Sequence, residues 1–516
     1  MDKELKKKVE DVLKKNKLTE YILIDLSNKI LKRPYIKGEK IDIVFLFQSP
    51  SFWPSWESLW EECIADERIN PIMLVSDDPI KEKVQFVNAR VFLDEQKISY
   101  KHVADVNLDE LNPHIIVLHT PYDGHRPRYL HGKQLSAKGH RTVYIPYGIE
   151  ISDISRARND HFTGGVTTTA WRIYTFSKDM IPYYKMFSPT GGDMVRSFGH
   201  PKFDRSNKQY FPSLPEDIQL KAKGRKVLLL KVHFPKKVNG KMITPSLDMY
   251  INFIKTLSTY HNLFCIFMPH PKFYEELANF KSVDDFRELI ETTENMLEYT
   301  DDDYRPVLMN CDYYMVDRSA LMVEAGATGK PILYISTKDP EPMTKPVQKI
   351  VDSYYQANSG SDIKKFMDDV VILDEDPLQE ERAEVFKSII LDMEGKSGYM
   401  IKEDIVNSLI NDKQVNINSP ILTDEFKELL LLKDSINNNP FNKEFKEFIK
   451  ELYYAKDMED VKLQLVKEHI KSHLSYKLGN AMVNATKEPF GLIKLPWKLK
   501  NIYSDFKRKQ NIKSKK

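Results

Sequence analysis

The chain has 516 residues, more than one ordinary hydrophobic core accommodates, so we expect two or three domains. Its 77 Lys and Arg nearly balance its 75 Asp and Glu, which argues against a protein that binds nucleic acid through bulk positive charge. The three cysteines, Cys63, Cys265 and Cys311, lie far apart in apolar surroundings. This pattern argues against a disulfide framework and a zinc site and is typical of a reducing compartment.

The N-terminal segment, residues 1–38, predicts a pair of helices and no sorting signal. Apolar residues recur at helical spacing over 2–15 and 19–32. The first residues are charged and form no apolar signal core, and no run in the chain approaches the ~18 apolar residues of a membrane span. We therefore expect a cytoplasmic protein.

Residues 39–205 predict the first of two α/β domains, which we expect to bind an acceptor. The run 41–47 is nearly all apolar, as a strand buried on both faces should be, and a helix beginning at Pro54 follows it. Strands that alternate with helices are typical of a doubly wound parallel sheet. Further strands are expected at 72–75, 90–93, 115–119, 142–147, 172–176 and 194–198.

Residues 206–376 predict a second α/β domain, which begins with a polar, proline-containing linker and which we expect to bind a nucleotide-linked donor. Two doubly wound domains with a cleft between them form the architecture called GT-B. The same outline also fits sugar-nucleotide epimerases and some binding proteins, so the fold leaves the chemistry open. Strands are expected at 226–232, 263–268, 313–316, 332–335 and 370–373, and helices at 246–259, 274–292, 320–328 and 361–367.

The remainder of the chain is predicted to be helical. Residues 377–488 show helical periodicity without a strand pattern. Residues 489–516 form a basic amphipathic tail, in which nine Lys and Arg face one acidic residue and Trp, Leu and Ile are interleaved. This composition suits an anionic membrane surface better than RNA, and a solvated terminus is the third interpretation.

The segment 309–335 is the strongest candidate for a ligand site. It predicts a strand, a short helix and a strand, a right-handed βαβ unit whose first loop lies at the carboxyl edge of the sheet. That loop offers the cation of Arg318, the hydroxyl of Ser319 and the N–H groups of the helix start, which together suit a phosphate. Glu324 is placed to reach ribose hydroxyls. The alternative is a capped helix with a solvated Arg318.

His270 follows the strand predicted at 263–268, in a Met-Pro-His-Pro-Lys sequence that ends at Lys272. Prolines on both sides restrict its backbone. A stiffened histidine at the cleft edge can donate to a phosphate and stabilise a nucleotide leaving group, so we assign His270 a catalytic and donor-binding role, with Lys272 beside it. We expect this loop and the 317–319 loop to meet at one site. The alternative is a histidine that bonds its own loop.

The first domain offers candidate bases in the sequence His-Thr-Pro-Tyr-Asp-Gly-His, which follows the strand at 115–119. Transfer to an alcohol needs a base, and a histidine oriented by an aspartate is a common solution. His119 and Asp123 form one candidate pair, and His125 is the competitor. Solvated histidines are the alternative. The segment 146–150, after the next strand, is placed to line an acceptor pocket.

Several signatures of cofactor sites do not occur in the sequence. It contains no GxGxxG after the first strand, no Walker A motif and no GxSxG. The acidic run 301–303 is better explained as a solvated loop than as a metal motif. Neither a cofactor nor an obligatory divalent metal is therefore indicated, and the donor is expected as a substrate.

These segments resemble the CDP-glycerol glycerophosphotransferases, relatives of the teichoic-acid primases and polymerases that also occur in capsule loci. The resemblance covers roughly residues 41–375 and implies that His270, Arg318, Ser319 and Glu324 hold a cytidine diphosphate donor. Asp-Arg-Ser replaces the Asp-Tyr-Ser-Ser of many members, and the Trp-His-Gly turn with the polymerases' proposed base is absent. The resemblance rests on FLFQSPSFWPSWESLWEEC, HIIVLHTPYDGH, TVYIPYG, GHPKFD, MPHPK and VDRSALMVEAGATGKPILYI.

We therefore predict an enzyme that transfers glycerol phosphate, or a related polyol phosphate, from a CDP-linked donor to a hydroxyl of a cell-surface polysaccharide or lipid-linked acceptor and releases CMP. The tail is expected to hold it at the inner face of the cell membrane, without a nucleic-acid partner. Two alternatives stay open. One is a GT-B glycosyltransferase that uses a nucleotide sugar in capsule or lipopolysaccharide synthesis, and the other is a non-catalytic membrane-associated scaffold.

Overall fold

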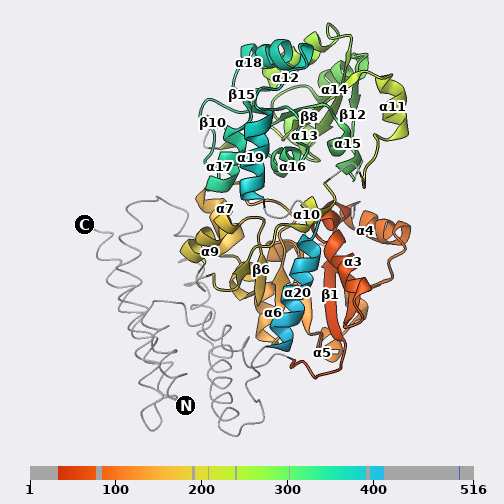
Figure 1. Ribbon diagram of the computed structural model, residues 1–516, viewed down its shortest axis with the longest axis vertical. Helices are drawn as coiled ribbons and strands as arrows, with labels where there is room; N and C mark the ends of the chain where they lie inside the picture. The colour runs from red at the N-terminus through yellow and green to blue at the C-terminus, as the bar shows by residue number, and fades with distance from the viewer. Residues whose placement is uncertain are drawn as a thin grey trace, which may run out of the picture.

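The computed structural model contains two α/β domains, one above the other in Figure 1. It describes residues 33–411, apart from gaps at 77–83, 189–191, 207–208, 239–240, 302 and 391–394, together with residue 499. Each domain is a doubly wound parallel sheet, so the predicted GT-B-like fold is confirmed. The helices predicted within 1–32 and 412–488 and the basic tail lie outside the described residues.

The first domain is built on a seven-stranded sheet in the order β3-β2-β1-β4-β5-β6-β7, and every neighbouring pair is parallel. Parallel pairing places the carboxyl ends of all seven strands at one edge. The strands are β1 (Ile41–Phe47), β2 (Ile69–Val75), β3 (Tyr100–His102), β4 (Ile115–Leu118), β5 (Thr142–Tyr144), β6 (Arg172–Tyr174) and β7 (Val195–Arg196).

The strand predicted at 41–47 is confirmed as β1, and its alternate residues face different halves of the core. Ile43 and Phe45 pack with helices α3 (Glu57–Ala65) and α20 (Ser397–Ile410). Val44 and Leu46 belong to the cluster on the opposite face of the sheet. A strand covered by helices on both faces needs apolar residues at every position, which explains its unbroken apolar sequence.

The second domain is built on a six-stranded parallel sheet in the order β12-β11-β8-β13-β14-β15. Helices α12 (Leu247–Leu257) and α14 (Val283–Thr292) cover one face and α15 (Arg305–Asn310), α16 (Ala320–Gly326) and α17 (Lys345–Asp352) the other. The strands are β8 (Lys226–Val232), β11 (Leu263–Pro269), β12 (Met296–Glu298), β13 (Tyr313–Val316), β14 (Ile332–Ile335) and β15 (Tyr355–Ala357).

Two predicted strands are wrong. The run 90–93 lies inside helix α4 (Val84–Glu95), and 370–373 lies largely within a π-helical turn (Met367–Ile372) after helix α18 (Gly360–Phe366). A four-residue apolar run fits a buried strand and one side of a helix equally well, so periodicity does not separate them. Three edge strands, β3, β12 and β15, were not predicted, whereas the fourth edge strand, β7, was predicted within 194–198.

The last two described helices divide between the domains. Helix α19 (Gln379–Ile389) packs on the second domain through Phe386, whereas α20 returns to the first domain against α3. Asp204 anchors this return, because its carboxylate accepts hydrogen bonds from Ser58 Oγ and from the backbone N–H groups of Ser397 and Gly398. Among the described helices, none is both long and apolar enough to cross a membrane.

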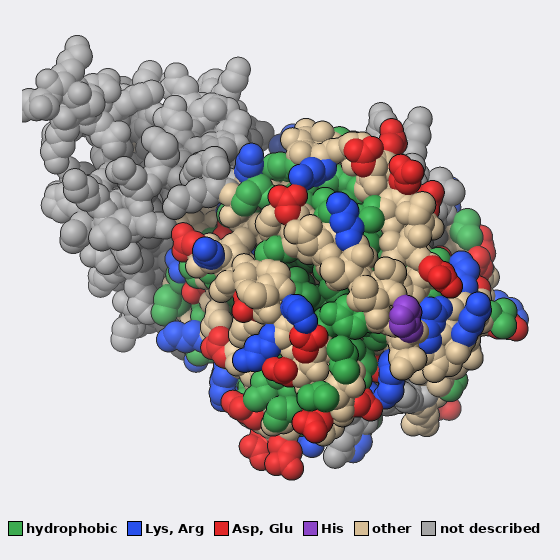
Figure 2. All heavy atoms as spheres, turned by 90° about the horizontal axis from the view of Figure 1, so that it is seen from above, with side chains coloured by type: hydrophobic (Ala, Val, Ile, Leu, Met, Phe, Trp, Pro, Cys, Tyr) green, Lys and Arg blue, Asp and Glu red, His purple; other side chains and the backbone are tan. Residues whose placement is uncertain are grey.

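The outer end of the second domain, which carries α12 and α18, has a mixed surface. Figure 2 shows basic and acidic side chains interspersed over this face, with apolar side chains between them. Charges of alternating sign cancel each other's field within a few side chains, so this face lacks the single-sign patch that steers nucleic acid to a protein. The candidate ligand site lies instead in a cleft between the two domains.

Candidate functional site

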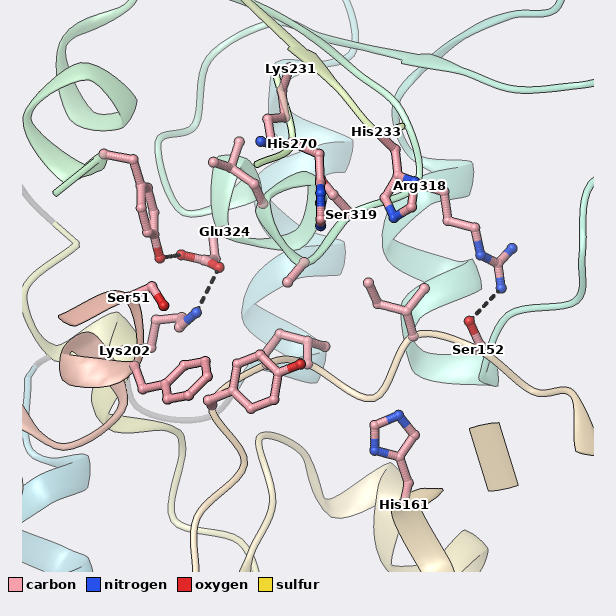
Figure 3. A pocket seen from close by; sticks show the side chains of 18 of the residues that line it. Ser51, Ser152, His161, Lys202, Lys231, His233, His270, Arg318, Ser319 and Glu324 are labelled. Carbon is pink, nitrogen blue, oxygen red and sulfur yellow. Dashed lines mark hydrogen bonds and ion pairs between the residues drawn. The ribbon is translucent and has the colours of Figure 1, made fainter. Parts of the chain in front are cut away.

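A cleft of about 450 Å³ lies between the carboxyl edges of the two sheets. The first domain lines it with Ser51 and Phe52 after β1, Tyr122 after β4, and Tyr147 and Ile149 after β5. Figure 3 shows the labelled polar residues of the second domain on the opposite wall. A crevice outside the carboxyl ends of parallel strands is where open α/β sheets bind their ligands.

The two loops that we expected to meet do lie at one site. Strands β11 and β13 both pair with β8 in parallel, so their carboxyl ends stand on either side of it. His270 after β11 and Arg318 and Ser319 after β13 all line the cleft. The hydroxyl of Ser319 is buried and has no hydrogen-bond partner among the described residues, which leaves it available to a ligand.

Arg318 lines the cleft and also links the two domains. Its guanidinium donates to Ser152 Oγ at 2.9 Å, to the Pro342 carbonyl at 2.9 Å and to the Glu341 carbonyl. These acceptors are neutral, and the Glu341 carboxylate lies 4.0 Å from Arg318 Nε. Arg318 therefore presents a positive charge at the cleft that Glu341 balances in part, and its hydrogen bonds are used within the protein.

Glu324 is paired with Lys202 of the first domain. Lys202 Nζ lies 3.0 Å from Glu324 Oε1, the two side chains are 6% and 5% exposed, and Tyr304 donates to the other carboxylate oxygen. Lys202 comes from helix α10 (Pro201–Asp204), within the His-Pro-Lys triplet of the first domain. The structure thus gives Glu324 a cross-domain ion pair, where the sequence suggested contact with a ribose.

Lys231 and Asp317 are two buried ionisable groups near the cleft that the sequence alone did not indicate. Burial lowers the pKa of Lys231 to about 8, and its Nζ lies 3.3 Å from the Pro269 carbonyl. Burial raises the pKa of Asp317 to about 6, and its two oxygens each accept the His233 N–H at 2.8 Å. Asp317 also accepts from Tyr250 and so fixes the loop after β8 against the loop after β13.

Two histidine rings of the second domain lie side by side at the cleft. The ring centroids of His233 and His270 are 4.9 Å apart. His270 Nδ1 accepts the Lys272 N–H at 3.1 Å, which places the proton of the neutral ring on Nε2, where it can be donated. His233 Nδ1 lies 3.1 Å from the Phe234 carbonyl and donates to it. Lys272 itself is exposed and does not line the cleft.

The bases predicted in the first domain do not reach the cleft, which corrects the expected pairing. His119 is fully buried between Phe52 and Trp56, at ring distances of 4.6 and 4.5 Å, and neither ring nitrogen has a hydrogen-bond partner among the described residues. Asp123 does not orient it, because its Oδ1 accepts from Arg126 and from the Gly132 N–H, both at 2.8 Å.

His125 also lies outside the lining of the cleft. Its backbone carbonyl accepts from Gln48 Nε2 at 2.7 Å, and its ring contacts Tyr122 at 5.1 Å. The first domain instead presents His161, on helix α7 (Ser155–Phe162), together with the rings of Tyr122 and Tyr147. Sequence reasoning missed His161 because it sits on a short polar helix without a strand-end signal.

The balance of charge in the cleft favours an anion. Its lining contains four Lys or Arg side chains, Lys202, Lys231, Lys236 and Arg318, against two glutamates. Glu324 neutralises Lys202, so the second-domain lining keeps three cations and two histidines against the Glu341 carboxylate, and the buried Asp317 balances part of the Lys231 charge. Among the described residues no group of three or more acidic, histidine or cysteine side chains could hold a metal ion.

Comparisons with known proteins identify a fold but no family for the chain as a whole. The profile of a family described as "Domain of unknown function (DUF8374)" matches residues 400–516, most of which lie outside the described part. No curated protein matches the sequence significantly. The solved structures are more informative.

The S. aureus MnaA–UDP co-structure aligns with a TM-score of 0.51 at 15% identity over 72% of this chain and 97% of that one. A putative UDP-N-acetylglucosamine 2-epimerase from Listeria monocytogenes aligns at 0.51 with 11% identity over 72% and 98%. The likeness is one of fold. The wall teichoic acid polymerase TagF aligns at 0.49 with 12% identity over 76% and 93%, too low a score to add to the argument.

Proposed function

We propose that this protein is a transferase that moves glycerol phosphate, or a related polyol phosphate, from a CDP-linked donor to a hydroxyl of a cell-surface polysaccharide or lipid-linked acceptor. The observation that carries the proposal is the set of cationic and histidine side chains on the second-domain wall of the cleft: Lys231, Lys236, His233, His270 and Arg318. Both phosphates of a pyrophosphate diester are anionic, so a donor of this kind complements that wall. The cytidine and the polyol of the donor are inferred from the sequence resemblance.

In this mechanism the acceptor oxygen attacks the β-phosphorus of the donor, a new P–O bond forms, and the bond to the CMP oxygen breaks. CMP leaves with the electron pair of that bond. His270 Nε2 donates to the departing phosphate, while Lys231 and Arg318 balance the charge that develops on it. All three groups belong to the second domain, which therefore binds the donor.

A donor screen tests the proposal. Purified protein is incubated with CDP-glycerol, CDP-ribitol, CMP-linked sugars or UDP-linked sugars, each with glycerol, glycerol 3-phosphate or N-acetylglucosamine as acceptor, and nucleotide release is measured. Release of CMP from CDP-glycerol or CDP-ribitol, dependent on an acceptor, is the expected result. Release of nucleotide from a nucleotide sugar alone would move the assignment to the glycosyltransferase alternative. That alternative draws on the UDP bound by MnaA, which has the same fold.

A matched pair of lysine variants tests whether the cationic wall binds the donor. Lys231→Met removes a cation at the carboxyl end of β8, whereas Lys226→Met removes one at the opposite end of the same strand. Losing one charge-assisted hydrogen bond costs roughly 1.5–3 kcal/mol, so Lys231→Met should weaken CDP binding by about 10- to 150-fold in calorimetry. Lys226→Met should leave the affinity for CDP unchanged.

The scaffold alternative and the membrane site have their own tests. A scaffold without a nucleotide site gains no thermal stability from CDP, whereas a binder gains RT ln(1 + [L]/Kd).

Peripheral attachment at the inner face of the cell membrane is proposed from the sequence of the 489–516 tail alone. The full chain should then float with anionic vesicles, and a chain ending at residue 488 should not.

A further inference from the structure

The three histidines that line the cleft divide between its two walls. His233 and His270 belong to the second domain, where the donor is proposed to bind, and each has its Nδ1 engaged with a backbone group of its own loop. His161 alone comes from the first domain, on helix α7. In Figure 3 its ring stands across the cleft from His233 and Arg318. It therefore lies on the first-domain wall, where the acceptor is proposed to bind.

The imidazole of His161 contacts the Phe162 ring, but one of its two nitrogens is left without a partner. Its Nδ1 is buried and has no hydrogen-bond partner among the described residues. A polar nitrogen left unpaired in a largely buried position costs free energy, and such sites are commonly completed by a ligand or an ordered water molecule. With no partner to fix the tautomer, either ring nitrogen can carry the proton and the other can accept one.

Burial lowers the pKa of His161 to about 4, so the ring is neutral and has a free lone pair at physiological pH. The same shift makes it a weak base in the empty cleft. An anionic donor adds negative charge to the opposite wall, which favours the imidazolium form and raises the pKa of His161 toward the range of effective bases. Donor binding therefore prepares this ring to take a proton.

The other candidate bases of the first domain are held away from an acceptor. His119 is sealed behind Phe52, and Asp123 is bound to Arg126. Burial raises the pKa of Tyr147, which stabilises its protonated phenol and makes it a poor proton acceptor. Among the groups that line the first-domain wall, His161 has a lone pair that can accept a proton and a ring nitrogen without a hydrogen-bond partner among the described residues.

We propose that His161 is the catalytic residue that accepts the proton of the attacking hydroxyl. The inference rests on the proposed transfer reaction and deepens it. As the acceptor oxygen forms its bond to the donor's β-phosphorus, its proton passes to the free nitrogen of His161, and the P–O bond to CMP breaks with the electron pair leaving on CMP. Deprotonation of the imidazolium by water then restores the neutral ring.

Two variants of His161 and one control test the proposal in the full-length protein. His161→Gln keeps a polar side chain of similar size but cannot accept the proton, and His161→Ala leaves space for free imidazole. His261→Gln removes an exposed histidine that lies outside the cleft. The assay is CMP release from CDP-glycerol with the acceptor that gives the highest rate for the native protein.

The expected result is a kcat lower by about 10²- to 10⁴-fold in both His161 variants, with the thermal stabilisation by CDP retained. Added imidazole should restore at least part of the activity to His161→Ala but not to His161→Gln, and His261→Gln should match the native rate. Retained CDP stabilisation shows that the variants are folded and that their donor site is intact.

The two proposals fail in different ways. Native-like turnover by His161→Gln, in a protein whose native form transfers, would overturn the role of His161 and leave the transferase function standing. Loss of activity together with loss of CDP stabilisation, without rescue of His161→Ala, would also overturn it, because it would mark a structural role. No CMP release by the native protein with any acceptor would overturn the transfer function itself and this inference with it.

Discussion

The ion pair between Lys202 and Glu324 joins the two domains inside the cleft, and its removal tests whether a buried charge holds them together. The atoms are 3.0 Å apart, and the side chains are 6% and 5% exposed. Lys202→Met keeps most of the length of the side chain but removes the ammonium group. The Glu324 carboxylate then has Tyr304 as its remaining donor among the described residues.

The magnitude follows from the cost of an unpaired buried charge. Removing one partner of a buried ion pair typically costs about 3–5 kcal/mol, because the other charge stays desolvated without compensation. Replacing both partners removes that cost, so the double variant Lys202→Met/Glu324→Gln should regain most of the lost stability. The single variant should therefore be the least stable of the three proteins.

Urea unfolding followed by circular dichroism and tryptophan fluorescence measures these differences. Lys138→Met is the matched control, because Lys138 forms a 2.8 Å ion pair with Asp109 in which the side chains are 44% and 56% exposed. An exposed pair contributes less than about 1 kcal/mol. If Lys202→Met destabilises no more than Lys138→Met, or if the double variant is no more stable than the single one, the reasoning from burial is wrong.

Three more predictions concern single positions. Burial raises the pKa of Glu150 from 4.5 to about 7, so its contribution to stability is present below pH 4.5 and is lost as the pH rises through 7. In urea titrations from pH 5 to pH 8, the free energy of unfolding of Glu150→Gln should rise relative to that of the native protein by on the order of 3 kcal/mol. Gly398→Ala would place Cβ 2.6 Å from the backbone of α3 and should cost about 1–3 kcal/mol, whereas Gly360→Ala, which meets nothing within 4 Å, should cost little. Ser319→Ala should weaken CDP binding about 2- to 10-fold in calorimetry without loss of stability, because no described partner is lost.

The second-domain wall of the cleft could be predicted from the sequence because its residues follow apolar runs. His270, Arg318 and Ser319 come directly after β11 and β13, and the carboxyl ends of parallel strands meet at one edge whatever the rest of the fold does. Lys231 gave no such signal, since it lies within a strand whose other residues are almost all apolar. Its position at the cleft depends on where β8 ends, which a propensity argument does not resolve.

The first-domain wall could not be predicted because it depends on the direction of single side chains. His119 follows β4, and a shift of one residue in a strand reverses the face to which a side chain points. In the structure the His119 ring points into the core and packs against the rings of Phe52 and Trp56. The partner of Glu324 was hidden for another reason, since Lys202 is distant in sequence and only the packing of the two domains brings them together.

The links between the domains differ in what a ligand could do to them. Residues 151–153 of the first domain form backbone hydrogen bonds with residues 342–344 of the second domain beside the cleft, and a charged ligand would not compete for these bonds. Lys202 and Glu324 neutralise each other, so an anion gains little by approaching either. Arg318 instead donates to neutral oxygens of Ser152, Glu341 and Pro342. A phosphate offers it stronger, charge-assisted hydrogen bonds than these groups do. An anionic donor can therefore replace the hydrogen bonds that Arg318 makes between the domains. The ion pair and the backbone hydrogen bonds of 151–153 with 342–344 then keep the walls of the cleft in place.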